Sequence, residues 1–270
     1  SPVDLTATFA RPVAARVHAR LAGIPDDAVG TYEQLFDHDA PLQERFEFVR
    51  RVLEAARTSP GEDVASDLLA AELTPGEAEG LLFVLLTSGR DSVGYMIATT
   101  TVALLERPAL FEAVSRDPER IAGAIEEFMR FGTMFLTLFP RTPGEPVELD
   151  GWTFPAGETV AVSAVAANRD PRRFADPDTL DLDRDAAGHL AFGFGRHGCL
   201  GQQLARVEIG EALTGLVREF PDLRLVDAEQ AAPMTLAHPV GSYAAGRVLV
   251  AWGADPEPGG VVPRRASVRR

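Results

Sequence analysis

The sequence predicts a mainly helical α+β fold, because three observations point the same way. Apolar residues recur at helical spacing through the first half of the chain, to about Met129. Short strand-like segments follow between residues 147 and 165, and a further helical pattern covers 200–220. Helices that come first and strands that come later, without regular alternation, are typical of α+β domains rather than of repeated βα units.

The first predicted helix has one apolar residue at every fourth position, which indicates a single apolar face: Leu5, Phe9, Val13, Val17 and Leu21. Gly23-Ile24-Pro25 should end this helix, since glycine and proline are typical of helix C-termini. The same spacing predicts a second helix over 42–56 and a short third helix over 64–71.

The longest predicted helix has the clearest start. Thr74 and Glu77 have the spacing of a capping box, and Pro75 stands at the first helical position. The apolar run that follows, from Leu81 to Leu105, is nearly apolar all round, so this helix should cross the centre of the domain. Arg90-Asp91 interrupts the run, and two charges in a central helix need a structural or chemical reason.

The remaining elements are shorter. Asp117-Pro118-Glu119 should begin a helix that continues to about Met129. Asp150-Gly151 between two strand-like triplets predicts a hairpin. The other expectations are a strand-like stretch over 158–165, an irregular meander over 168–185, a late strand over 247–252, one domain over 1–252 and a disordered tail over 253–270.

Composition excludes several classes of protein. The 270 residues carry a formal net charge of -14, which argues against nucleic acid as a partner and against binding to anionic membranes. Cys199 is the only cysteine, so no intrachain disulfide can form. The N-terminus has neither a basic region nor a long apolar run, so it does not read as a signal peptide. We expect a cytoplasmic protein without a membrane partner.

The single cysteine lies in a glycine-rich entrance to a helix, between His189 and Gly201. A thiolate is the form of cysteine that binds metals, and a helix N-terminus stabilises negative charge. Glycines let the backbone approach a flat ligand closely. One cysteine without further ligands at zinc-finger spacing argues against structural zinc, whereas one thiolate suffices for haem iron.

This stretch resembles the haem-binding loop of the cytochrome P450 family, F-G-x-G-x-H-x-C-x-G, at all six specified positions: Phe192, Gly193, Gly195, His197, Cys199 and Gly201. The resemblance to bacterial members implies a P450-like helical domain with a small β-rich subdomain. It also implies that haem b is the cofactor, that Cys199 is the ligand to the iron, and that the other five residues contact the cofactor. The alternative is a glycine-rich loop around a buried cysteine that binds nothing.

Two further segments follow the family's order. Glu127 and Arg130 match E-x-x-R, and their spacing places both on one helix face, where they can pair. The resemblance implies that a meander arginine, for which Arg184 is the best candidate, joins this pair and braces the cysteine loop. Arg141 stands where the family has an arginine that faces a haem propionate, although an isolated loop arginine is usually a solvated charge.

Ser88-Gly89-Arg90-Asp91-Ser92 resembles the family's distal-helix signature, A/G-G-x-D/E-T. Dioxygen activation consumes protons, and the resemblance implies that Asp91 and Ser92 relay them as catalytic residues. Gly89 should leave room for the ligand. Serine replaces the usual threonine and so loses the methyl group that restricts the rotamer. The alternative is an Asp-Ser pair tolerated at a boundary between helix and solvent.

The resemblance begins partway into the family's fold. The family's N-terminal helices and its W/H-x-x-x-R motif have no counterpart, since neither tryptophan and none of the five histidines has arginine four positions later. We expect either a fragment of a longer protein, which we favour, or a naturally shortened member. Residues 30–60 are also short for the two helices that usually cover the pocket.

The resemblance implies a haem-thiolate monooxygenase that hydroxylates a small organic substrate, often a secondary metabolite in bacterial members. Electrons would come from a ferredoxin and an NAD(P)H-dependent reductase, because the chain has no flavin or iron–sulfur motif. Phe135, Leu136 and Val240 are candidate pocket residues. Two alternatives stay open: an accessory protein that stabilises or activates another enzyme, and a peroxygenase or dehydrating haem enzyme that needs no redox partner.

Overall fold

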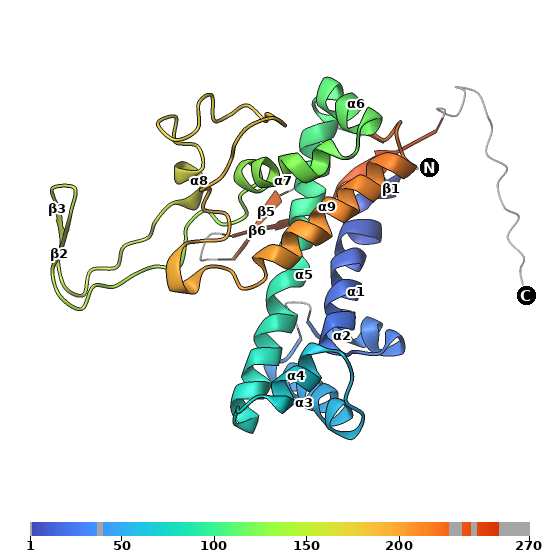
Figure 1. Ribbon diagram of the computed structural model, residues 1–270, viewed down its shortest axis with the longest axis vertical. Coiled ribbons are helices and arrows are strands. Elements are labelled where there is room, and N and C mark those ends of the chain that lie inside the picture. Colours follow the sequence, from blue (N-terminus) through green and yellow to red (C-terminus); the bar gives the residue numbers. More distant parts are fainter. Residues whose placement is uncertain (1, 37–39, 227–233, 239–241, 254–270) are drawn as a thin grey trace, which may run out of the picture.

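One long helix, α5 (Pro75–Leu105), runs through the length of the molecule (Figure 1). The structure is a computed structural model, and it describes residues 2–36, 40–226, 234–238 and 242–253. The predicted start of α5 is confirmed: the Glu77 amide donates to Thr74 Oγ1 at 3.3 Å, and Glu77 Oε2 accepts from the Thr74 amide at 2.8 Å. The two bonds satisfy helix-end amides that have no partner within the helix.

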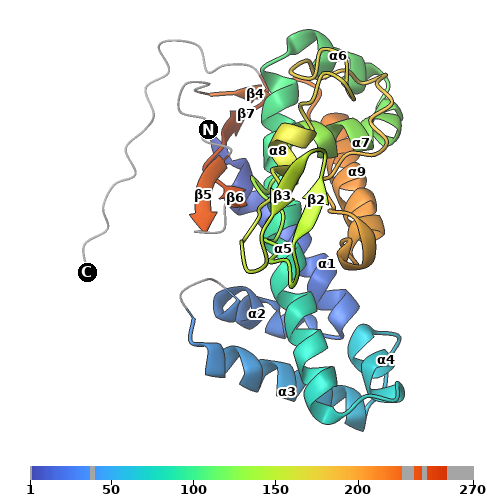
Figure 2. The same cartoon turned by 90° about the vertical axis from the view of Figure 1, so that its left-hand side faces the viewer.

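Helices pack around both ends of α5 and form two apolar cores (Figure 2). The first core surrounds the N-terminal half of α5 and is built by α1 (Arg11–Ala22), α2 (Val29–Leu35), α3 (Leu42–Thr58) and α4 (Val64–Ala70). The second core surrounds the C-terminal half and is built by α6 (Pro108–Arg116), α7 (Arg120–Phe131) and α9 (Gln202–Glu219). The mainly helical α+β prediction is confirmed.

The first helical segment differs from its prediction. The chain begins with the short strand β1 (Val3–Asp4) and a π-helical turn (Thr6–Ala10), and α1 follows. The predicted apolar face is wrong, because Leu21 is 41% exposed whereas the buried side of α1 is alanine-rich and carries His18. A strict four-residue spacing drifts around a helix of 3.6 residues per turn, so Leu5 and Leu21 cannot share one face.

The strands are short and lie at the edges of the helical body. β1, β7 (Leu249–Ala251) and β4 (Arg224–Leu225) form an antiparallel sheet in the order β1-β7-β4. The other two sheets are two-stranded and antiparallel: β2 (Val147–Leu149) with β3 (Trp152–Phe154), and β5 (Met234–His238) with β6 (Ser242–Ala245).

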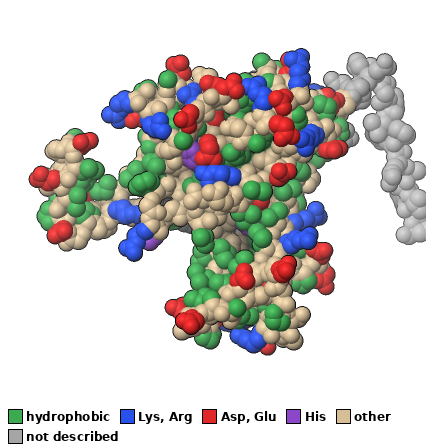
Figure 3. Space-filling model, in the orientation of Figure 1, with side chains coloured by type: hydrophobic (Ala, Val, Ile, Leu, Met, Phe, Trp, Pro, Cys, Tyr) green, Lys and Arg blue, Asp and Glu red, His purple; other side chains and the backbone are tan. Residues whose placement is uncertain are grey.

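The β2–β3 hairpin is confirmed and extends as an arm away from the helices (Figure 1). Its turn has positive φ at both central residues, 52° at Asp150 and 79° at Gly151, as a two-residue hairpin requires. Figure 3 shows apolar surface on this arm, where Leu149 and Trp152 are 65% and 74% exposed.

The strand-like stretch over 158–165 is only partly correct. Within it, Val160 forms an isolated bridge with Arg141, and the carbonyl oxygen of Val162 accepts from the Leu138 amide at 2.8 Å, but no strand forms. The one-turn helix α8 (Ala164–Ala167) replaces the rest, because Ser163 Oγ accepts from the Ala166 amide at 3.1 Å and so caps a helix start. The meander after it is confirmed. The predicted disordered tail lies outside the described residues from position 254 onward.

α5 is long and apolar enough to span a membrane by length and composition. However, half of its most apolar window is buried inside the protein, and it packs against α1, α3 and α9. These contacts are those of a central core helix.

Candidate functional site

The loop that carries Cys199 folds back on itself before α9 begins. The Cys199 amide donates to the carbonyl oxygen of Phe192 at 2.8 Å, and the Gly198 amide donates to that of Gly195 at 2.9 Å. A single 3₁₀ turn, Gly195–His197, lies between these contacts. The loop thus holds Cys199 close to the start of α9 with its side chain exposed.

The surface around Cys199 suits a flat, apolar ligand. Gly193 and Gly195 have φ of 70° and 77°, and a Cβ at either position would have no neighbour within 4 Å. A Cβ at Gly201 would lie 3.9 Å from Cys199 Sγ, so this glycine keeps the approach to the sulfur open. Phe194 and Leu200, on the same loop, are apolar and 86% and 84% exposed.

The donor set fits haem iron. No group of three or more His, Cys, Asp and Glu side chains gathers within the described residues as a multidentate metal site would require. Haem iron requires only one ligand from the protein, and a cysteine thiolate can be that ligand. The exposed sulfur of Cys199, with glycines beside it, meets this requirement. Phe192, Gly193, Gly195, Cys199 and Gly201 therefore fit the cofactor-binding roles that the sequence predicts for them.

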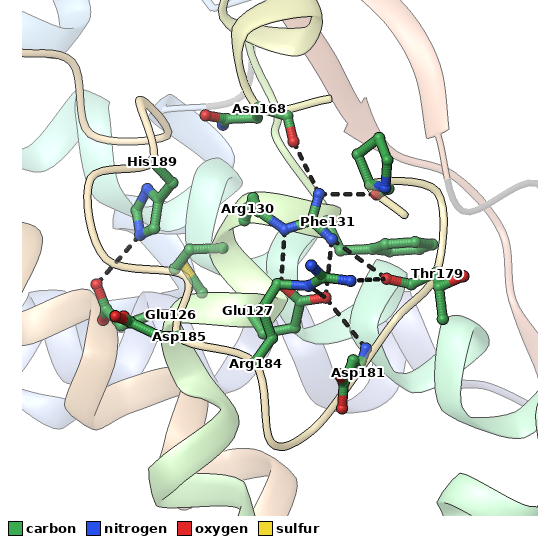
Figure 4. A network of polar contacts seen from close by, with 12 residues as sticks. Glu126, Glu127, Arg130, Phe131, Asn168, Thr179, Asp181, Arg184, Asp185 and His189 are labelled. Atoms are coloured by element: carbon green, nitrogen blue, oxygen red, sulfur yellow. Dashed lines mark hydrogen bonds and ion pairs between the residues drawn. The ribbon is translucent and has the colours of Figure 1, made fainter. Parts of the chain in front are cut away.

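A buried ion pair braces the meander against α7 (Figure 4). Glu127 and Arg130 are fully buried and paired. Arg130 Nε donates to Glu127 Oε2 at 2.6 Å, and Arg130 Nη2 donates to Glu127 Oε1 at 2.8 Å. Arg184 Nε lies 3.2 Å from Glu127 Oε1, so the predicted third member of this cluster is correct. Arg130 also donates to the carbonyl oxygens of Asn168 and Pro177. The pair thus fixes the segment that leads to the Cys199 loop.

Asn168 and His189 continue this bracing into the loop itself. Asn168 Oδ1 accepts from the Leu190 amide at 2.7 Å. His189 Nδ1 accepts from the Ala191 amide at 3.1 Å, so the ring proton lies on Nε2, which donates to Glu126 Oε2 at 3.1 Å (Figure 4). Burial lowers the pKa of His189, and the opposing effect of Glu126 is smaller. His189 therefore starts the loop as a neutral side chain.

This burial predicts a pH-dependent stability. An unfolded chain protonates His189 below about pH 6.5, whereas the folded protein does so only at lower pH. The unfolded state then binds more protons in that window, so the free energy of unfolding falls as the pH drops below about 6.5. We expect His189→Gln, which cannot titrate, to lose less stability than the wild type between pH 7.5 and 5.5 in urea unfolding. Equal losses in the two proteins would contradict this assignment.

The interruption of α5 has a structural reason that sequence reasoning missed. Arg90 is buried and donates to the carbonyl oxygens of Glu33 at 2.9 Å and Phe36 at 2.8 Å, where α2 ends. It also pairs with Asp91, with 3.2 Å between Arg90 Nε and Asp91 Oδ1. Arg90 thus ties α2 to the predicted proton-relay segment. A charge within an apolar helix was the only signal for this role.

Ser92 bonds to the backbone of its own helix. Its Oγ donates to the carbonyl oxygens of Ser88 at 3.0 Å and Gly89 at 3.1 Å, yet α5 stays helical from Pro75 to Leu105. A serine hydroxyl can bond the preceding turn of its own helix in this way, and here the bond does not interrupt the helix. Asp91 and Ser92 lie on α5, and α9, which follows the Cys199 loop, packs against α5.

The sequence predicts that Gly89 leaves room for a ligand. In the structure a side chain of the protein itself fills that space. A Cβ at this position would overlap the ring of His18, which packs from α1 directly onto the α5 backbone. His18 Nε2 also lies 3.4 Å from Glu208 Oε1 on α9, and both side chains are buried. The small residue is thus required for a three-helix contact between α1, α5 and α9.

Gly89→Ala should therefore destabilise the protein by about 1–3 kcal/mol, the usual cost of overpacking. The double variant Gly89→Ala/His18→Ala should lose less stability than the sum of the losses in the two single variants. Once the His18 ring is removed, the alanine side chain no longer clashes with it. Urea unfolding of the four proteins measures this coupling. Strict additivity of the two changes would exclude the contact as the reason for glycine.

The remaining predicted site residues are His197, which lies on the Cys199 loop, and Arg141, Phe135, Leu136 and Val240, which lie outside it. His197 and Arg141 are exposed, and Arg141 donates to the carbonyl oxygen of Phe139 at the base of the hairpin arm. Phe135 and Leu136 are half-buried between α7 and that arm, and Val240 lies outside the described residues. The propionate-binding roles of His197 and Arg141 and the pocket roles of Phe135 and Leu136 stay predictions.

Comparison with known proteins agrees with this architecture. The family model described as Cytochrome P450 matches residues 121–236. Cytochrome P450 105C1 from Streptomyces sp is 39% identical over 93% of this chain and 69% of its own length, and the monooxygenase PikC from Streptomyces venezuelae is 36% identical over 82% and 57%. The chain spans between 57% and 69% of the curated relatives that it matches.

Solved structures give the same result. Rif16 superimposes with a TM-score of 0.85 at 34% identity, over 94% of this chain and 70% of that one. Cytochrome P450 MoxA from Nonomuraea recticatena also reaches 0.85, at 32% identity over 94% and 66%. With the glycine-bounded Cys199 loop and the buried Glu127–Arg130 pair, these similarities show that the chain belongs to the cytochrome P450 family.

Proposed function

We propose that this chain is the haem-thiolate part of a monooxygenase that hydroxylates a small organic substrate. The single observation that carries the proposal is the exposed Cys199, which lies on an open glycine loop braced by the buried Glu127–Arg130 pair. When bound through a thiolate, haem b activates dioxygen, so that one oxygen atom enters the substrate and the other leaves as water at the expense of two electrons and two protons.

The residues of the chain divide the supporting tasks. Cys199 would supply the sulfur ligand to the haem iron, and Gly193, Gly195 and Gly201 would leave space for the cofactor. Asp91 and Ser92 deliver protons from α5, with Arg90 holding the Asp91 carboxylate in place. His197 and Arg141 bind the anionic rim of the cofactor. Phe135, Leu136 and Val240 line the substrate pocket.

The names of relatives support a small organic substrate. One is named a nocardicin C N-oxygenase, from Nocardia uniformis, and a solved relative from Bacillus megaterium holds corticosterone or testosterone. None of these three compounds is assigned to this protein. Electrons come from NAD(P)H through a reductase and a ferredoxin, and the protein works in the cytoplasm on a secondary metabolite.

One spectrum tests the proposal. The haem-loaded protein, reduced and exposed to carbon monoxide, should show the red-shifted Soret band of a thiolate ligand. Failure to take up haem would favour the accessory-protein reading. Turnover with hydrogen peroxide but not with a ferredoxin system would favour the peroxygenase reading.

A further inference from the structure

A second ion pair joins α7 to α9 directly beside the buried Glu127 cluster. Arg206 of α9 binds Glu126 of α7 through two hydrogen bonds. Arg206 Nε donates to Glu126 Oε1 at 2.5 Å, and Arg206 Nη2 donates to Glu126 Oε2 at 2.9 Å. Such fork-to-fork pairs fix direction as well as distance. The hydrogen bond from Arg206 is the largest cause that lowers the pKa of Glu126, so the carboxylate stays charged.

This pair reaches the cysteine loop through two aromatic rings. The Arg206 guanidinium lies 4.7 Å from the ring centroid of Phe192, within cation–π range. The same Glu126 accepts from His189, whose ring centroid is 5.9 Å from that of Phe192. The carbonyl oxygen of Phe192 in turn accepts from the Cys199 amide. Glu126 thus holds two side chains that contact Phe192, the residue whose carbonyl oxygen accepts from the Cys199 amide.

The pair also balances charge near the sulfur. The hydrogen bond to Glu126 is the main reason that the pKa of Arg206 is raised. Arg206 packs on the ring of Phe192, whose carbonyl oxygen accepts from the Cys199 amide, so this cation lies on the residue that is bonded directly to the cysteine backbone. A cation near a ligating thiolate draws electron density from it, and a neighbouring carboxylate offsets that cation.

We infer that Glu126 is a positioning residue, which through Arg206 and His189 fixes Phe192 at the start of the Cys199 loop and sets the net charge that the sulfur experiences. The effect on the charge at the sulfur rests on the proposed function, whereas the effect on the position of Phe192 does not. The sequence offers no motif for the role, because Glu126 precedes the E-x-x-R segment and Arg206 lies 80 residues further along the chain.

The same two helices provide a matched control. Glu119 at the start of α7 pairs with Arg218 near the end of α9, with 2.6 Å between the nearest charged atoms. Both side chains are mostly exposed, and neither contacts the cysteine loop through any bond among the described residues. Glu119→Gln and Arg218→Met remove the same chemistry from the same helix pair, so only effects specific to the loop should separate the two sets of variants.

Two measurements on the whole protein test the inference. Amide hydrogen exchange over residues 189–199 of the haem-free protein should be about tenfold faster in Glu126→Gln, Arg206→Met and Arg206→Lys than in the wild type or the control variants. The reduction potential of the haem-loaded protein should rise in Glu126→Gln, fall in Arg206→Met and stay near the wild-type value in Arg206→Lys, because lysine keeps the charge but not the fork.

A merely structural role would not shift the reduction potential in opposite directions in Glu126→Gln and Arg206→Met. Shifts of Glu126→Gln and Arg206→Met in the same direction would overturn the charge role, and unchanged exchange in both would overturn the positioning role. Similar effects in Glu119→Gln would show that the pair is not specific to the loop. A wild-type protein that takes up no haem would contradict the proposed function, while hydrogen exchange would still decide whether Glu126 holds the loop.

Discussion

Replacing Cys199 with serine is expected to abolish the red-shifted Soret band of the reduced, carbon-monoxide-bound protein. The band reports a thiolate opposite the bound gas, and serine supplies an oxygen in place of the sulfur. Because the Cys199 side chain is exposed and its amide makes the loop contact to Phe192, the substitution removes the ligand without removing the hydrogen bond that shapes the loop. The urea midpoint should stay near the wild-type value.

Val207→Ala is the control for this substitution. Val207 lies on α9 and is 62% exposed, outside the loop and its contacts, so its replacement should leave the band intact. A thiolate-type band that survives in Cys199→Ser would mean that another group ligates the iron, and the assignment of the site would then be wrong. Loss of the band together with unfolding would show up in the urea midpoint.

The cysteine loop and its buried brace were predictable because they depend on local spacing. Gly193, Gly195 and Cys199 stand within one short segment, and Glu127 and Arg130 stand one helical turn apart. Their spacing allows a pair on one helix face and a glycine-rich loop around the cysteine, and the resemblance to the family supplied the bracing and haem-binding roles. Arg184 was more distant, and the resemblance to the family pointed to it.

Contacts between distant segments were not predictable. Arg90 bonds to carbonyl oxygens 54 and 57 residues earlier in the chain, and His18 occupies the space that Gly89 leaves on another helix. Neither partner has a sequence signal, since a backbone carbonyl is available at every residue and a glycine notch accepts many shapes. The buried face of α1 was mispredicted for a related reason: its alanines pack closely, and the larger leucines and valines do not define that face.

Arg130→Met is expected to lower the free energy of unfolding by about 3–5 kcal/mol, the usual cost of breaking one side of a buried ion pair. Arg130 and Glu127 have no exposed side-chain surface, so removal of the guanidinium leaves a buried carboxylate with only Arg184 and the Asp181 amide as partners. The carbonyl oxygens of Asn168 and Pro177 lose their donor as well. Urea unfolding, with the slope checked for two-state behaviour, measures the loss.

Arg120→Met separates burial from charge in this prediction. Arg120 begins the same helix and pairs with Asp183 of the meander at 2.8 Å, but Asp183 is 81% exposed. Exposed pairs contribute about 0–1 kcal/mol, so this variant should stay close to the wild type. A loss in Arg130→Met no larger than that in Arg120→Met would mean that the meander does not depend on the buried pair. The combined variant Glu127→Gln/Arg130→Met should lose less than the sum of its single changes, because the second substitution removes the charge that the first one strands.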